Sequence, residues 1–381
     1  MKKNYLFTLL GIMSFALSAC SKKIPESIDF TLKDLGTAVE IHTEEQIAFL
    51  NSTDPSGYVS THSMDLATFS KSAPNAITFS WENTINNGDK PSKYIVEIKD
   101  SYDTVKVETK NTSVDVYNLK VNTEYKWTVS AYYDSKNIFT SSEATFVTGQ
   151  APRNIKVEGM ENVRDLGGWD VGEGKIYKQG MIYRSAELNG DKDGLSKPTK
   201  EGKRVLLEDL KIKSDIDLRK TKEAFDEDEV CGITSSPLGN NVNYVSCPMV
   251  FGHSNIFSNS KNVESLKKFF EYLAVKDNYP MVFHCVRGTD RTGGLAYAIS
   301  AMCGVSKTDL MKDYLFSNFA NINSSVITED DINKPAFYVY QINNFEGETL
   351  SEKAMNYINA KVGVSKETLK AIVDILVEEK K

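Results

Sequence analysis

Short runs of alternating hydrophobic and polar residues fill residues 76–149. Clusters of turn-forming residues separate these runs, which read AITFSW, KYIVEIK, TVKVET, SVDVYNL, YKWTVSAYY and EATFVTG. A period of two residues places alternate side chains on one face of a strand, and many short strands in succession are typical of an antiparallel sandwich. The pattern therefore predicts an all-β sandwich over residues 71–150.

The pattern changes after the linker GQAPRN, where strand candidates begin to alternate with helix candidates. The expected strands are MIYRSA, SDIDLR, VNYVSCPM and PMVFHC. The expected helices cover residues 199–209, 263–274, 292–303, 307–318 and 366–379. Alternation of this kind favours an α/β fold. We expect this second domain to cover residues 151–381.

Residues 1–19 have the layout of a secretory signal, because Lys2 and Lys3 precede an apolar stretch that is shorter than the ~20 residues needed to span a bilayer. The ending Leu-Ser-Ala-Cys resembles the lipobox of bacterial lipoproteins, in which the cysteine, here Cys20, is lipidated. The alternative is an ordinary signal that is cut near Ala19. The resemblance implies a lipid-anchored protein of a bacterial cell envelope, on the periplasmic face or at the cell surface.

Residues 20–70 follow neither pattern. The segment SKKIPESIDF is interpreted as a polar tether after the anchor, and TEEQIAFLNSTDPSG has room for a brief helix. In this arrangement the sandwich either serves as a spacer between the membrane and the second domain or binds a surface ligand. The sequence favours the spacer, since the sandwich shows no chemistry of its own.

Composition and charge narrow the classes of function. The 381 residues are 40% hydrophobic and 25% charged, which allows two domains with buried cores. The formal net charge of -7 and the absence of a basic stripe argue against nucleic acid as a partner. The four histidines, at positions 42, 62, 253 and 284, show no metal-ligand spacing, so we expect neither a metal nor another cofactor.

Four cysteines remain besides Cys20, and two of them, Cys247 and Cys303, lie in apolar segments. We expect these two to be small buried thiols rather than members of disulfides. Cys285 stands elsewhere, in the segment HCVRGTDRTG between a strand candidate and a helix candidate. Such a loop directs backbone N–H groups and the positive end of a helix toward one point, which suits a phosphate group.

Two further residues of this loop fit a phosphate site. Gly288 permits a tight turn, and Arg291 can hold two phosphate oxygens at once. The same positive field lowers the pKa of a thiol from ~8.5 to ~3.5–7.5, which would make Cys285 a nucleophile at neutral pH. Its attack on a bound monoester would form a phosphocysteine, while a nearby acid protonates the leaving oxygen and then activates water.

The loop HCVRGTDRTG resembles the signature loop of the cysteine-dependent protein tyrosine phosphatases. The surrounding segments resemble the atypical bacterial branch of that superfamily, the tyrosine phosphatase-like family; they are NVRDLGG, IYRSAEL, IDLRKTKE, GVSKTDLMKDYLFSN and GVSKETLKAIVDIL. The sandwich, with Trp81, Tyr125 and Trp127, resembles a fibronectin type III domain. We therefore expect a multidomain chain with an N-terminal all-β fibronectin type III-like sandwich and a C-terminal α/β cysteine-phosphatase domain.

The resemblance implies a role for each residue of the loop. Cys285 is the expected nucleophile, and Arg291 is the expected phosphate clamp. His284 would orient the loop. The residues expected to bind the substrate, through the loop backbone or through a hydroxyl near the sulfur, are Val286, Arg287, Gly288, Thr289 and Thr292.

The general acid has two candidates. Asp290 is preferred because a proton donor must come within ~3 Å of the leaving oxygen, and a loop residue starts close to it. Asp217, in the segment IDLR, is the alternative; in a structural role it would pair with Arg219 or Arg164 or support the cradle. Glu223 is expected to have a similar supporting role.

The predicted activity is metal-independent hydrolysis of phosphomonoesters on proteins or small molecules, as in a protein tyrosine phosphatase, with dual specificity as an option. Dual-specificity and phosphoinositide-active relatives often carry lysine just before the loop aspartate, where this chain has Thr289, while Arg287 brings a charge at another point. Two alternatives stay open. One is a phosphoinositide or other lipid phosphatase, and the other is a non-catalytic lipoprotein that binds a phosphorylated or surface ligand.

Overall fold

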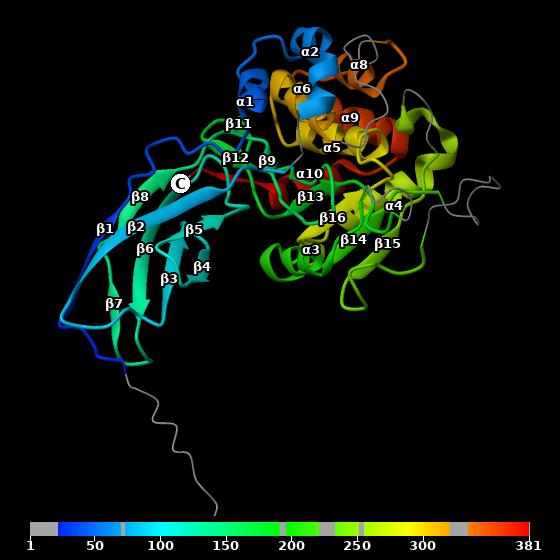
Figure 1. Ribbon diagram of the computed structural model, residues 1–381. Helices are drawn as coiled ribbons and strands as arrows, with labels where there is room; N and C mark the ends of the chain where they lie inside the picture. Colours follow the sequence, from blue (N-terminus) through cyan, green and yellow to red (C-terminus); the bar gives the residue numbers. More distant parts are fainter. Residues whose placement is uncertain are drawn as a thin grey trace, which may run out of the picture.

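The computed structural model describes residues 22–69, 73–190, 196–220, 233–250, 255–320 and 334–380. Cys20 and Glu223 lie outside the described residues, so their expected roles stay predictions, and Cys231 lies outside them as well. The described chain forms a β-sandwich and an α/β domain, which lie side by side (Figure 1). In this part of the chain, no helix is both long enough and apolar enough to cross a membrane.

The sandwich is built from two antiparallel sheets. One sheet contains, in spatial order, β1 (Ser27–Leu32), β2 (Ile77–Asn86) and β5 (Ser113–Val116). The other contains β4 (Thr104–Thr109), β3 (Lys93–Lys99), β6 (Glu124–Tyr132) and β7 (Ile138–Thr140), and β8 (Ala144–Val147) pairs with β6. Trp81 and Trp127 are buried, as the alternation predicts, and the Tyr125 hydroxyl accepts a hydrogen bond of 2.8 Å from the backbone N–H of Lys120.

Strand β1 corrects the interpretation of its segment as a polar tether. It pairs with β2 along its full length, from Ser27 opposite Asn86 to Leu32 opposite Trp81. None of its side chains is fully buried, because β1 lies at the edge of its sheet. An edge strand can keep a polar composition, which explains why the sequence pattern did not reveal it.

The next segment forms two helices, α1 (Glu44–Leu50) and α2 (Pro55–Phe69), which we call the N-terminal arm. Thr43 and Gln46 form a capping box at the start of α1, where the sequence left room for a helix. The arm packs on the α/β domain, over α6 (Lys307–Leu315) and the 3-10 helix η5 (Phe316–Phe319) (Figure 1). The Phe49 ring lies 6.1 Å from the Phe316 ring and 5.5 Å from the Phe319 ring.

A six-stranded sheet forms the centre of the α/β domain. Its spatial order is β15 (Asn243–Ser246), β14 (Ser214–Asp217), β16 (Met281–His284), β13 (Ile182–Ser185), β10 (Arg164–Asp165) and β9 (Arg153–Asn154). The four strands from β15 to β13 are parallel and correspond to the four predicted strands, so these predictions are confirmed. The short strands β10 and β9 extend the sheet in antiparallel fashion.

Helices cover this sheet, and most of them match the expected ranges. They are α3 (Lys200–Arg204), which continues as the π-helix η1 (Val205–Asp209), α4 (Val263–Leu273), α5 (Arg291–Met302), α6, α8 (Tyr338–Asn343), α9 (Leu350–Val362) and α10 (Lys366–Leu376). Three short 3-10 helices, η2 (Ile256–Ser258), η3 (Ser260–Asn262) and η4 (Lys276–Asn278), flank α4. Helices α8 and α9 were not predicted.

The last predicted helix, at residues 366–379, extends three residues too far. α10 ends at Leu376, and Val377–Glu379 forms strand β17 instead. β17 joins β12 (Lys175–Tyr177) and β11 (Asp170–Gly172) in a separate three-stranded sheet. Because the partner strand comes from a distant part of the chain, local periodicity could not reveal this change from helix to strand.

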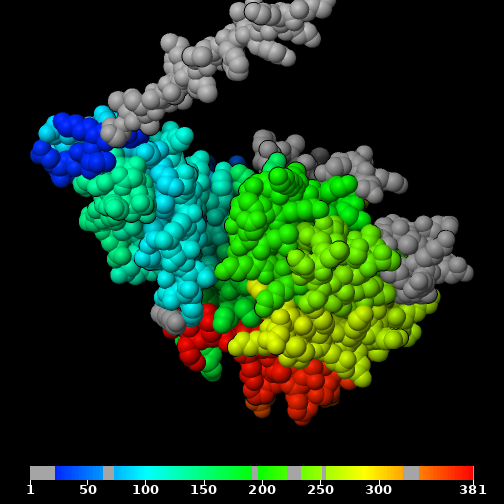
Figure 2. Space-filling view, turned by 90° about the horizontal axis from the view of Figure 1, so that it is seen from below, coloured from blue at the N-terminus to red at the C-terminus, as the bar shows by residue number. Residues whose placement is uncertain are grey.

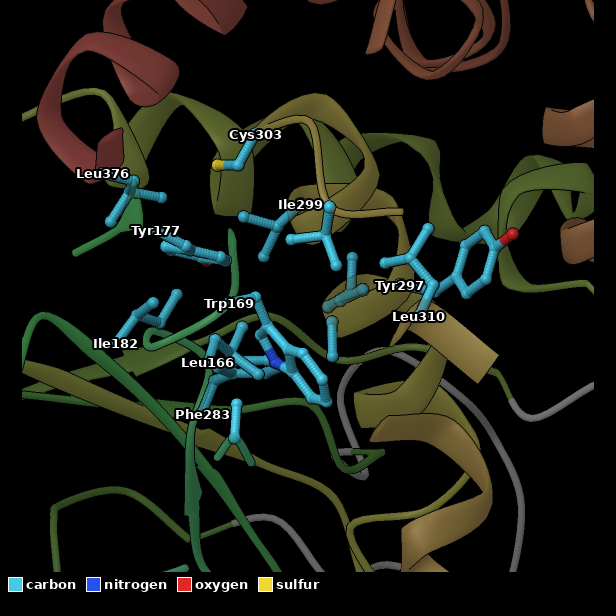
Figure 3. Close-up of a cluster of buried hydrophobic side chains, with 14 of the residues drawn as sticks. Leu166, Trp169, Tyr177, Ile182, Phe283, Tyr297, Ile299, Cys303, Leu310 and Leu376 are labelled. Carbon is cyan, nitrogen blue, oxygen red and sulfur yellow. The ribbon is translucent and has the colours of Figure 1, made fainter. Parts of the chain in front are cut away.

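The hydrophobic core of the α/β domain lies between the sheet and α5, whose residues from Thr292 to Met302 are all buried. Figure 3 shows side chains of this cluster, including Ile182 and Phe283 from the sheet, Ile299 from α5, Cys303 directly after α5, and Leu376 from α10. Cys303 and Cys247 are buried free thiols, which confirms the prediction for both. Burial raises the pKa of Cys247 to about 12, so this thiol is inert at neutral pH.

The sandwich and the α/β domain touch each other (Figure 2), and hydrogen bonds from a buried arginine join them. The Arg153 side chain, at the start of the α/β domain, donates to the carbonyl oxygens of Leu119 and Asn118 in the sandwich, at 3.2 and 2.6 Å. Its Nη1 also pairs with Asp165 Oδ2 in β10 at 2.9 Å. The sandwich is therefore attached to the α/β domain through hydrogen bonds from Arg153, whose charge is paired inside the α/β domain, as well as through the linker.

Candidate active site

Cys285 lies at the carboxyl end of strand β16, where the chain turns toward the N-terminus of α5. The turn depends on Gly288, whose φ of 71° is in the left-handed region that disfavours other residues. A Cβ atom on Gly288 would lie 2.4 Å from the backbone oxygen of Ser185 in the neighbouring strand β13. Glycine is therefore required both by the backbone conformation and by the close approach of the loop to the sheet.

The loop carbonyl groups are held from behind by the rest of the domain. Four consecutive carbonyl oxygens accept hydrogen bonds: Cys285 from His284 Nδ1 (3.2 Å), Val286 from the Glu187 N–H (3.0 Å), Arg287 from Asn162 Nδ2 (3.1 Å) and Gly288 from Arg184 Nη2 (2.7 Å). In a trans peptide, the N–H of the following residue points opposite to the carbonyl. The next four N–H groups are therefore turned to the other side of the loop, as an anion cradle requires.

The residue Cys285 is 3% exposed, and burial alone would raise the pKa of its thiol. The charge of Arg291 and hydrogen bonds from the hydroxyl and backbone N–H of Thr292 outweigh burial, so the pKa of Cys285 is lowered. In the described part of the chain, the buried Thr292 hydroxyl has no nitrogen or oxygen partner. The charge of Arg291 and the contacts with Thr292 thus favour the thiolate form of Cys285.

Arg291 is held loosely next to the sulfur. Its Nη1 makes two long hydrogen bonds, of 3.4 Å to the carbonyl oxygen of Leu218 and of 3.3 Å to that of Met249. Its Nε is buried and has no hydrogen-bond partner among the described residues. Because a buried donor without a partner is costly, this guanidinium is suited to receive an oxyanion.

His284 lies fully buried directly behind Cys285. Its Nε2 lies 3.1 Å from Asp215 Oδ1, and its Nδ1 lies 4.0 Å from Asp217 Oδ1. Burial alone would lower the pKa of His284, but Asp217 and Asp215 raise it. The two carboxylates thus favour the protonated ring, whose Nδ1 contacts the Cys285 carbonyl oxygen in a geometry that fits the expected orienting role.

The two candidates for the general acid have opposite surroundings. Asp290 is exposed at the N-cap of α5, where it makes no capping hydrogen bond although aspartate is a favoured cap. Asp217 is 1% exposed; its Oδ1 accepts from Arg219 Nε at 2.9 Å and its Oδ2 from Arg219 Nη2 at 2.7 Å. Burial alone would raise the pKa of Asp217, but His284 and Arg219 lower it. Such a carboxylate is a poor proton donor, so the geometry favours Asp290.

The remaining residues that were predicted for the loop differ in their exposure to solvent. Arg287 is exposed, Val286 is half-buried and Thr289 is 3% exposed. Arg219 also pairs with Glu187 at 2.8 Å, beside the loop. Within the described ranges, no group of three or more His, Cys, Asp or Glu side chains is placed to hold a metal ion.

Sequence reasoning missed several residues that support the loop. These are Asn162, Arg184, Glu187 and Asp313, which contact the loop directly or through one another. They lie in the segments NVRDLGG, IYRSAEL and GVSKTDLMKDYLFSN, which carried the family resemblance. Those segments were the available signal, but the contacts join residues far apart in the chain.

Comparisons with known proteins agree with this arrangement. Residues 65–148 match the fibronectin type III domain, and residues 155–379 match the tyrosine phosphatase family. A Cupriavidus necator protein that carries the name of a tyrosine-protein phosphatase is 25% identical over 205 residues, which are 46% of this chain and 70% of the relative. The core catalytic domain of the PP-IP phosphatase SIW14 from S. cerevisiae, solved with citrate, is 24% identical and has a TM-score of 0.29; the match covers 45% of this chain and 82% of that one. Since the family match spans more than half of the sequence, the chain belongs to the tyrosine phosphatase family and is a phosphoric monoester hydrolase with a preceding fibronectin type III domain.

Proposed function

We propose that the protein is a metal-independent protein tyrosine phosphatase, with dual specificity as an option, that acts through a phosphocysteine intermediate. One observation supports this most directly. The Cys285 thiol is buried beside Arg291 at the N-terminus of α5, and its pKa is lowered despite the burial. A thiolate at this place is a nucleophile and lies in the positive field that a phosphoryl group also needs.

In the first step, the Cys285 sulfur attacks the phosphorus of the bound monoester. A P–S bond forms and the P–O bond to the leaving group breaks, while Asp290 gives its proton to the departing oxygen. Arg291 and the loop N–H groups stabilise the charge on the three non-bridging oxygens. Asp290 would start this step protonated, and its exposed position at the loop allows it to approach the substrate.

In the second step, water attacks the phosphocysteine. The Asp290 carboxylate takes a proton from the water, a P–O bond forms and the P–S bond breaks. The products are inorganic phosphate and the Cys285 thiolate, which the Thr292 hydroxyl stabilises. The position of Thr292 next to the sulfur, where its hydroxyl has no nitrogen or oxygen partner among the described residues, supports this assignment.

Hydrolysis of an aryl phosphate without added metal tests the proposal. Cys285→Ser should abolish turnover, because a serine hydroxyl is far less acidic than the thiol. Cys303→Ser is the matched control, since this buried thiol lies in the core behind α5 and should leave turnover within about twofold. A folded wild-type protein without activity would favour the alternative of a non-catalytic protein that binds a phosphorylated ligand.

The role of Asp290 has a separate test based on leaving groups. Asp290→Asn should lower turnover of phosphotyrosine by roughly 100-fold, because general acid catalysis typically contributes 10²–10⁴-fold. A nitrophenyl phosphate needs little protonation of its leaving oxygen, so its turnover should fall much less. Equal losses on both substrates would exclude Asp290 as the acid.

The substrate class follows from charge at the loop. Thr289 is a buried, uncharged residue at the position where relatives that act on phosphoinositides often carry a lysine, so it adds no charge for a second phosphate. This favours a substrate with a single phosphoryl group, such as phosphotyrosine in a protein. Kinetics on phosphopeptides and phosphoinositides decide between this class and the lipid alternative.

We also propose that Cys20 carries a lipid anchor in a bacterial cell envelope, on the basis of the lipobox-like ending Leu-Ser-Ala-Cys. Labelling of cells with a radioactive fatty acid should mark the wild-type chain. Cys20→Ser should remove the label and release the protein from the membrane fraction. Cys303→Ser should keep the label and stay in the membrane fraction. A labelled Cys20→Ser protein would contradict the anchor.

A further inference from the structure

Two arginines and one aspartate form a buried charged cluster behind the phosphate loop. Arg164 in β10 and Arg184 in β13 are both 0% exposed, and Asp313 in α6 lies between them. Asp313 Oδ1 accepts from Arg164 Nε at 3.1 Å, and its Oδ2 accepts from Arg184 Nη1 at 2.7 Å. Its backbone oxygen also accepts from Arg164 Nη2 at 3.0 Å. One carboxylate thus bridges two guanidinium groups.

The cluster contacts the loop directly through Arg184, and it also reaches the loop through Asn162, which accepts from Arg164 Nη1 and donates to the Arg287 carbonyl oxygen. Arg184 Nη2 donates to the Gly288 carbonyl oxygen at 2.7 Å, while Nη1 of the same group is held by Asp313. A guanidinium is planar, so fixing one nitrogen fixes the direction of the other. The orientation of the Gly288 carbonyl therefore depends on the position of Asp313.

The charges in the cluster explain why the aspartate is needed. Burial and the neighbouring charge of Arg184 lower the pKa of Arg164 to about 10, whereas Asp313 acts in the opposite direction. Burial alone would raise the pKa of Asp313, but the two arginines lower it, so its carboxylate is ionised. Without that carboxylate, two buried cations would repel each other next to the loop.

We propose that Asp313 is a positioning residue for the phosphate cradle, which acts through Arg184 to orient the peptide between Gly288 and Thr289. Because this carbonyl points back toward Arg184, the N–H of Thr289 points to the opposite, phosphate-binding side of the loop. The inference rests on the proposed function of the loop as a phosphate site.

For Asp313→Asn, the proposal predicts a change in phosphate affinity opposite in direction to the change expected from charge alone. Asp313→Asn removes a negative charge behind the loop, so Coulomb attraction alone would strengthen the binding of phosphate. Positioning predicts weaker binding, because Arg184 loses its charged partner and no longer fixes the Gly288 carbonyl. We expect a loss of about tenfold or more, as is typical of a hydrogen bond to a charged group.

The experiment measures how inorganic phosphate protects Cys285 from alkylation by iodoacetamide. This readout does not require turnover, so it stays valid even where the proposed hydrolysis fails. The phosphate concentration for half protection should rise about tenfold in Asp313→Asn. Asp309→Asn is the matched control on the same helix, since Asp309 contacts Ser306 outside the cluster. It should leave the half-protection concentration within about twofold of the wild type.

A second variant keeps the test informative if Asp313→Asn folds poorly. Arg184→Lys keeps the positive charge, but one ammonium group cannot fix the direction of a second donor as a planar guanidinium does. It should weaken phosphate protection to a similar extent. Unchanged or tighter phosphate binding in Asp313→Asn overturns the proposal, as does full phosphate binding in Arg184→Lys. Thermal melting identifies a variant that is only destabilised, because its folded fraction would bind phosphate with the wild-type constant.

Discussion

Replacing Gly288 by alanine adds one methyl group where the phosphate loop meets strand β13. The methyl carbon would lie 2.4 Å from the carbonyl oxygen of Ser185 and 2.8 Å from the backbone nitrogen of Ala186. Both atoms belong to the backbone. Ser185 lies in β13, which is paired with β16, and the Ala186 N–H donates to the Glu161 carbonyl oxygen, so neither atom can rotate away as a side chain could. The loop itself must move.

The size of the movement follows from these distances. Ordinary contact begins near 3.4 Å, so the methyl group is about 1 Å too close to the Ser185 oxygen. In addition, the φ of 71° costs a residue with a Cβ about 1–2 kcal/mol. A displacement of about 1 Å at reacting groups can lower the rate by roughly 100-fold. We therefore expect Gly288→Ala to lose about that factor in kcat/KM.

The assay is steady-state hydrolysis of an aryl phosphate together with thermal melting. Gly363→Ala is the matched control, because Gly363 has a similar φ of 79° at the end of α9. Among the described residues, no atom lies within 4 Å of the place that its added methyl group would take. This variant carries the same backbone strain without the clash. We expect Gly363→Ala to lower Tm by a few degrees and to keep kcat/KM within about twofold.

The comparison separates strain from displacement. If Gly288→Ala retains kcat/KM within about threefold of the wild type, the loop tolerates movement and the close contact with β13 does not control catalysis. If both variants lose activity to the same extent, backbone strain rather than displacement explains the loss. Either result would contradict a role for the close contact in catalysis.

Three further predictions concern charge, the domain junction and the N-terminal arm. The pH midpoint of Cys285 alkylation should lie below the ~8.5 of an ordinary thiol, because the lowered pKa keeps the reactive thiolate present at lower pH. Arg291→Met should move this midpoint upward, and a wild-type midpoint at ~8.5 would contradict the prediction. Arg153→Ala leaves the buried Asp165 carboxylate without its partner and should lower the free energy of unfolding by about 3–5 kcal/mol in urea titrations. A loss below about 1 kcal/mol would contradict a stabilising role of Arg153 at the domain junction. Phe49→Ala should open a cavity that costs about 3–5 kcal/mol and expose the arm to limited proteolysis, whereas unchanged digestion would exclude tight docking.

The parts of the fold that were predicted correctly depend on local patterns. The four parallel strands were predicted because short strand candidates alternate with helix candidates along the chain, and the first turn of α5 follows directly from the loop around Cys285. The edge strand β1 and the short strand β17 were missed because neither has a buried face of its own, and each is defined by its partner, β2 or β12. Periodicity detects burial but cannot detect pairing between distant segments.

The sequence by itself determined the two domains, the loop with Cys285 and Arg291, and the family resemblance, because each of these features depends on residues that are neighbours along the chain. Which charges support that loop depends on tertiary packing. Arg184 and Asp313 lie on a strand and on a helix that are far apart in the chain, and their ion pair exists only once α6 packs beside the sheet. A buried charge must find a partner, but the sequence does not name it, since packing decides which groups share the same interior space.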